Sequence, residues 1–170
     1  MKISICPGCG LALADRGLTD RLNASQACWE LYGELAAYTL ARGRDFIHQL
    51  AVDAYQAQHA VRGGSGIGMA FSLIGLCMVV ERGSTGLQVQ RAHMLLGKTK
   101  REWPQFELPR SPAPLTVRDV LDAEAGDARD AVMRQWCAAV WKSWSHAQAW
   151  TRQACDELLG ASFSRRVRGR

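Results

Sequence analysis

The segment Phe46–His59 most constrains the fold, because apolar residues recur along it at helical spacing and histidines stand near both ends. A matching helical pattern runs from Ser25 to about Ala41, and Gly43 separates the two segments. Helices joined by so short a turn pair antiparallel. The early chain therefore predicts a helical hairpin, with His48 near its turn and His59 at its open end.

Similar patterns continue through the rest of the chain, without the strand–helix alternation of an α/β fold. The segment 98–115 interrupts them: it contains four of the five prolines and is expected to wrap across the helices. We predict an all-α fold, a single compact bundle of about five to six helices within residues 1–163. Residues 1–24 would form an irregular Cys-x-x-Cys knuckle and loop. The expected later helices run from about Ile67 to Glu81, from Ser84 to Gly97, from Thr116 through Ala123 and from about Asp127 to Leu159.

Composition limits the cellular setting. A chain of 170 residues with 48% hydrophobic residues can bury one substantial core. Its longest apolar run, from Ile67 to Val80, is shorter than the roughly 20 residues that cross a bilayer, so no membrane insertion is expected. No export signal is visible, and six cysteines then indicate thiols or metal ligands in the cytoplasm.

The net charge of +5 is concentrated at the C-terminus. Arg165, Arg166, Arg168 and Arg170 supply most of it, which leaves the rest of the chain nearly neutral. We expect residues 164–170 to form a basic, disordered tail. A solubilising role is favoured for this tail, and contact with nucleic acid is possible only through Arg165–Arg170, because the nearly neutral body gives no sign of a basic surface.

The motif Cys6-Pro-Gly-Cys9-Gly10 is the sharpest chemical signal. Two thiolates at this spacing on a tight turn can bind one tetrahedral zinc ion. Two alternatives stay open: a redox-active pair, which would require a thioredoxin-like fold, and a turn that carries two unreactive thiols. The absence of a second Cys-x-x-Cys means that a zinc site must take its other ligands from elsewhere.

The helical hairpin supplies the two remaining ligands. Cys28 and His59 lie about equally far from the turn at Gly43, so antiparallel pairing brings them together. Cys28 also falls in the first turn of its helix, where the dipole favours a thiolate. Cys6, Cys9, Cys28 and His59 then form a closed Cys₃His set of the structural-zinc type.

Four further polar side chains belong either around that site or to another one. His48 lies eleven residues before His59, about 16 Å along a helix, so the two cannot share an ion. Tyr55 is one turn before His59 and is expected to pack against it. Asp53 would orient a ligand, form an ion pair or face water, and His93 is a candidate partner of His48.

Five blocks of the sequence carry a family resemblance. They are Cys6–Gly10, Cys28–Tyr32, His48–His59, Leu76–Gly83 and Val140–Trp144. Together they resemble a bacterial family, domain of unknown function 5946. The resemblance implies a bacterial, cytosolic protein and supplies no activity.

Two functions fit these observations. The first is a zinc-stapled helical protein that acts as a binding or accessory subunit, with a protein partner or a second copy of the chain. The partner would contact the Pro-rich wrap or a stripe of tryptophans that runs from Trp136 to Trp144. The second is a metalloenzyme with an open metal position near His48, Asp53 and His93. The sequence does not decide whether the protein is an enzyme.

Overall fold

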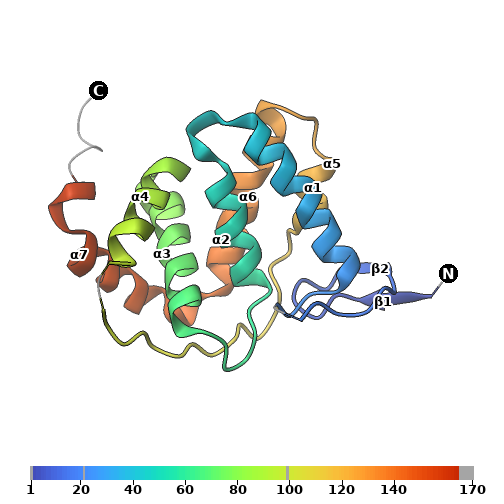
Figure 1. Cartoon of the computed structure of the whole chain (residues 1–170), viewed down its shortest axis with the longest axis horizontal. Helices are drawn as coiled ribbons and strands as arrows, with labels where there is room; N and C mark the ends of the chain where they lie inside the picture. Colours follow the sequence, from blue (N-terminus) through green and yellow to red (C-terminus); the bar gives the residue numbers. More distant parts are fainter. Residues whose placement is uncertain (1, 21, 99, 165–170) are drawn as a thin grey trace.

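The computed structural model describes residues 2–20, 22–98 and 100–164, and these residues form a mainly helical structure (Figure 1). The all-α prediction is confirmed, with one small sheet added: β1 (Ile3–Ile5) pairs antiparallel with β2 (Ala12–Ala14). None of these helices is long and apolar enough to span a membrane. The helices are α1 (Gln26–Arg42), α2 (His48–Gln58), α3 (Gly66–Arg82), α4 (Gly86–Leu96), α5 (Val117–Asp122), α6 (Asp127–Ser143) and α7 (Gln148–Ser164), with the 3-10 helices η1 (Arg44–Phe46) and η2 (Ser145–Ala147).

The predicted hairpin of α1 and α2 is present. The hydroxyl of Ser25 accepts a hydrogen bond from the backbone N–H of Cys28, so it caps α1 at the start of the predicted helical pattern. Gly43 ends α1 in the left-handed region, at φ 62°. The helical pattern indicated that the second helix starts near Phe46, but Asp45 and Phe46 lie in η1, with Asp45 at φ 49°, and α2 begins only at His48. The turn is therefore longer than the pattern indicated.

Two later boundaries also differ from the sequence expectation. Thr85, not Ser84, caps α4, because its hydroxyl bonds the N–H of Gln88 while the Gln88 side chain bonds the N–H of Thr85. The long helix expected from Asp127 is broken after Ser143 into α6 and α7. Burial of the Trp144 indole, which donates a hydrogen bond to the carbonyl of Ala57, fixes the chain where it turns.

The core is built around α3, which packs against α2, α4, α6 and α7 (Figure 1). Trp136 connects α6 to α2, because its indole N–H donates a hydrogen bond to the Gln58 side chain over 2.9 Å. The expected tryptophan stripe is buried in this core. Its members Met133, Trp136, Cys137, Val140, Trp141 and Trp144 are all at most 4% exposed. These contacts hold the end of α2, and with it His59, against the bundle.

The Pro-rich segment runs in an extended path past the ends of α3 and α6 (yellow in Figure 1). Two aromatic side chains anchor it. Trp103 packs edge-on against Phe71 of α3, and Phe106 packs edge-on against Trp150 of α7. Ser164 is the last residue of α7, and the rest of the predicted basic tail, residues 165–170, lies outside the described residues.

Candidate metal centre

Four potential metal ligands from three parts of the chain meet at the open end of the hairpin. Cys6 and Cys9 lie in the turn between β1 and β2, Cys28 lies in the first turn of α1, and His59 follows α2. Their sulfur and imidazole nitrogen atoms all lie within 4.8 Å of one another. All four side chains are buried, none more than 5% exposed. The predicted Cys₃His set is thus brought together in space.

The spacing of these atoms fits a tetrahedral ion. The sulfurs of Cys9 and Cys28 are 3.7 Å apart, and the Cys28 sulfur is 3.4 Å from Nε2 of His59. Tetrahedral zinc with Zn–S bonds of ~2.3 Å and Zn–N bonds of ~2.0 Å separates two sulfurs by roughly 3.8 Å and a sulfur from a nitrogen by roughly 3.5 Å. The two observed separations therefore agree with ligands arranged around one ion.

The knuckle is shaped by two backbone hydrogen bonds and two glycines. The N–H of Cys6 donates to the carbonyl of Leu11, and the N–H of Gly10 donates to the carbonyl of Cys6. Gly10 adopts a left-handed φ of 79° that other residues rarely tolerate. Gly8 lies so close to the His59 imidazole that a Cβ atom there would be 2.5 Å from its Cδ2 atom. The motif glycines thus let the knuckle approach the end of α2.

Hydrogen bonds orient the histidine and two of the sulfurs. Nδ1 of His59 must donate to the carbonyl of Tyr55, 2.9 Å away, so Nε2 is left with a lone pair directed towards the sulfurs. The hydroxyl of Tyr55 donates to the Cys28 sulfur, and the backbone N–H of Ser25 points at the Cys6 sulfur, each over 3.5 Å. Donors of this kind stabilise thiolate charge.

Hydrogen bonds within the cluster shift the pKa values of the three thiols in different directions. Hydrogen bonds from the Cys28 and Cys9 thiols lower the pKa of Cys6. Hydrogen bonds to Cys28 and to Cys6 raise the pKa of Cys9, and the bond to Cys6 raises the pKa of Cys28 to about 12. One thiolate is therefore stabilised by two neighbouring thiols, whereas a bound cation would favour the charged form of all three.

The other polar residues singled out in the sequence lie away from this cluster. Nδ1 of His48 is 2.8 Å from the hydroxyl of Thr39. The Asp53 carboxylate lies 3.9 Å from Nε2 of His93, which itself donates to the carbonyl of Phe71. Among the described residues, His48, Asp53 and His93 do not form a metal-ligand group of three or more; the only such group is the Cys₃His set.

Sequence reasoning missed part of the support around the ligands. Tyr55 was expected only to pack; its ring does stack on His59 at 4.0 Å, but its hydroxyl also bonds a ligand sulfur. The N–H of Asn23 donates to the carbonyl of His59 and joins the N-terminal loop to α2. The glycine of Cys-Pro-Gly-Cys could have indicated the close approach, whereas a backbone contact such as that of Asn23 leaves no pattern in the sequence.

The range of the chain that carries this site matches a known family. The model of DUF5946, described as a family of unknown function, covers residues 4–145. The chain belongs to this family. No curated protein and no solved structure matches the chain. The matched range includes all four candidate ligands, and the resemblance inferred from the five sequence blocks is confirmed. Membership in DUF5946 brings no activity with it, so function must be argued from the site.

Proposed function

We propose that Cys6, Cys9, Cys28 and His59 bind one zinc ion whose role is structural. The observation that carries the proposal is the convergence of four buried ligand atoms within 4.8 Å of one another. Thiolate and imidazole ligands in tetrahedral spacing favour zinc over harder cations such as Mg²⁺ or Ca²⁺. The ion would connect the β1–β2 hairpin to the first turn of α1 and the end of α2.

A structural role follows from the number and burial of the ligands. Four protein ligands complete a tetrahedral shell and leave no position for water or substrate, unlike a catalytic zinc site with three ligands. Cys28 and His59 are fully buried, so solvent has no path to the ion from that side. Zinc binding would displace the protons of the three thiols, and the cation would then attract the three thiolates. The ion would thus neutralise the thiolate charges and cross-link the segments that carry them.

Metal analysis tests this proposal directly. Protein purified without added metal should contain one zinc per chain by inductively coupled plasma mass spectrometry. Removal of the zinc by a strong chelator should lower the melting temperature, and stoichiometric zinc should restore it. Protein that contains no metal, or that refolds to the same stability without zinc, would contradict the structural role. One equivalent of iron in place of zinc would contradict the assigned metal.

The proposed cellular role is that of a binding or accessory subunit. A groove of about 830 Å³ lies between the Pro-rich segment and α6. Ala138, Ala139 and Pro112 supply an apolar lining. Arg110, Lys142 and Glu107 also line the groove, and none of the three forms an ion pair with another described residue. Two cations against one carboxylate leave the apolar groove net positive, which suits a protein partner with an acidic surface.

Site-specific photo-crosslinking tests the partner. A photoreactive amino acid in place of Ser111, which lines the groove, should give a discrete protein adduct in the cells that produce this chain. The same group in place of Leu40, which is 58% exposed on α1, is the matched control and should not give that adduct. The absence of an adduct at 111, or identical adducts at both positions, would refute this surface. An adduct with a second copy of the chain would contradict the acidic partner and show that the groove is an interface between two copies.

A further inference from the structure

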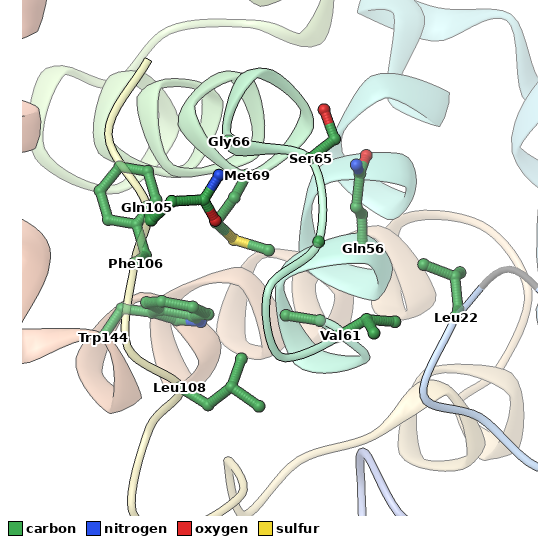
Figure 2. Close-up of a pocket in the computed structure, with 12 residues that line it drawn as sticks. Leu22, Gln56, Val61, Ser65, Gly66, Met69, Gln105, Phe106, Leu108 and Trp144 are labelled. Carbon is green, nitrogen blue, oxygen red and sulfur yellow. The ribbon is translucent and has the colours of Figure 1, made fainter.

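A second hollow lies where the loop before α3 meets the Pro-rich segment, and we call it the ring pocket (Figure 2). Its volume is about 140 Å³. Trp144 forms one wall, with Met69 of α3 and Phe106 of the Pro-rich segment beside it. None of the four candidate metal ligands lines the ring pocket. It is therefore a separate site from the metal centre.

The size and walls of the ring pocket fit one aromatic ring. A cavity of about 150 Å³ with apolar walls is enough to hold a benzene molecule. The ring of Phe106 is only partly buried and is held edge-on against the fully buried indole of Trp144, with centroids 6.4 Å apart. Phe106 therefore offers a ligand the ring contact that aromatic groups prefer. The thioether of Met69 adds a polarisable group that packs well against a ring.

The rim of the ring pocket carries uncharged polar groups. Gln56, Ser65 and Gln105 line it, and Ser65 and Gln105 are exposed to solvent. None of the three side chains makes a hydrogen bond within the described part of the chain. Ser65 directly precedes α3, yet its hydroxyl does not cap the helix. A carboxamide such as that of Gln105 both donates and accepts, so it can form two hydrogen bonds with another carboxamide.

Charge excludes most ionic ligands. No lining residue of the ring pocket has an ionisable side chain. A charged ligand would lose its hydration there without gaining a counter-charge, which costs far more than the loss for a neutral group. We propose that the ring pocket binds a small, uncharged aromatic amide. The ring occupies the space beside Phe106 and Met69, and the carboxamide pairs with Gln105 at the rim.

Close packing at the start of α3 supports a preformed site. A Cβ atom at Gly66 would lie 2.7 Å from the carbonyl oxygen of Pro104 and 3.5 Å from the Nε2 atom of Gln105. The Pro-rich segment therefore lies directly against the backbone of α3 at this glycine. This contact positions the backbone of Gln105, which follows Pro104, beside the pocket, so the ligand does not have to order a loose segment of backbone.

Nuclear magnetic resonance tests the proposal with benzamide as the probe. Benzamide should shift the indole N–H of Trp144, the backbone N–H of Gly66 and the side-chain amide of Gln105 in a saturable manner. The dissociation constant should be on the order of 1 mM, as is usual for so small a ligand. Benzoate and benzylamine, which match its size but carry a charge, should bind at least about tenfold more weakly.

Two variants that fill the ring pocket with a tryptophan side chain, and one control variant, test whether benzamide binds there. Val61→Trp at the mouth of the ring pocket should weaken benzamide binding at least about tenfold, and Gln105→Trp is the second variant should the first not fold. Ile67→Trp, an equally exposed position that does not line the pocket, should leave binding unchanged. No saturable shifts with benzamide, equal binding by the charged analogues, or undiminished binding by the filling variants would each overturn the proposal.

Discussion

The Nε2 atom of His59 lies 3.4 Å from the sulfur of Cys28, although 31 positions separate the two residues in the chain. The contact joins the start of α1 to the end of α2, and Cys6 and Cys9 complete the cluster from the N-terminal hairpin. The N-terminal hairpin, the start of α1 and the end of α2 thus meet at one small group of atoms. Most of the testable consequences concern what happens when that group is altered.

Replacement of Cys28 by serine should remove the metal and destabilise the fold. Serine keeps the size of the side chain but is a poor zinc ligand, so three ligands remain around a buried site. We expect the zinc content to fall below half an equivalent and the melting temperature to fall by about 6–12 °C, which corresponds to about 3 kcal/mol. Cys6→Ser should behave alike.

Cys77→Ser is the matched control for Cys28→Ser, because Cys77 is equally buried but lies in α3, outside the cluster. It should retain one full equivalent of zinc whatever its stability. Loss of zinc from both variants would mean that unfolding, and not loss of a ligand, empties the site. Metal analysis of the folded fraction separates these outcomes.

Replacement of His59 and replacement of His48 should have very different effects on zinc retention. His59→Ala removes a ligand and should abolish zinc retention after dialysis against a weak chelator. His48→Ala removes only the contact with the Thr39 hydroxyl, so it should keep its zinc and lose about 1 kcal/mol of stability. Equal zinc loss from the two variants would contradict this assignment of ligands.

The close approach of Gly8 to His59 gives a test that leaves all four ligands in place. Gly8→Ala would put a Cβ atom 2.5 Å from both the His59 ring and the carbonyl oxygen of Asn23, so the knuckle must shift. We expect at least about tenfold weaker zinc binding in a competition assay with a chromogenic chelator.

Gly33→Ala is the control, because a Cβ atom there meets no other atom within 4 Å and the residue is exposed within α1. It should leave zinc affinity unchanged and raise stability by about 0.5–1 kcal/mol through its better helix propensity. Unchanged zinc affinity in Gly8→Ala as well would show that the knuckle does not depend on this contact.

Asp53 should make the fold less stable as the pH rises. Burial raises the pKa of its carboxyl group well above the ordinary value, and its Oδ2 atom has no hydrogen-bond partner. The folded protein then keeps a proton that the unfolded chain releases above about pH 4, so stability falls as the pH rises past that value. Asp53→Asn removes this titration and should become progressively more stable than the wild type from pH 4 to neutrality.

Urea unfolding at several pH values measures this difference. Both proteins share the opposite trend from His93, whose pKa burial lowers to about 4, so that stability falls as the pH drops below its ordinary value. A constant difference between Asp53→Asn and the wild type over the whole range would show that Asp53 is already ionised in the fold.

The four candidate ligands could be foreseen from the sequence for a simple geometric reason. Each residue of a helix adds the same rise, so residues equally distant from the turn at Gly43 meet when the helices pair. Cys28 and His59 satisfy that condition, and the Cys-x-x-Cys motif is recognisable locally. Periodicity also marked the buried stripe that contains Trp136. All of these features depend on spacing along the chain.

Contacts between distant segments decided the rest. The backbone of η1 turns at Asp45 where the carbonyl of Phe46 packs directly against Gly86, and α6 ends where the Trp144 indole reaches Ala57. The ring pocket likewise exists only because residues of the Pro-rich segment cross the start of α3. Local sequence determined which segments of this protein are helical and which four side chains are candidate metal ligands. Tertiary packing determined its boundaries, supporting hydrogen bonds and hollows, because their energies come from atoms that no local pattern brings together.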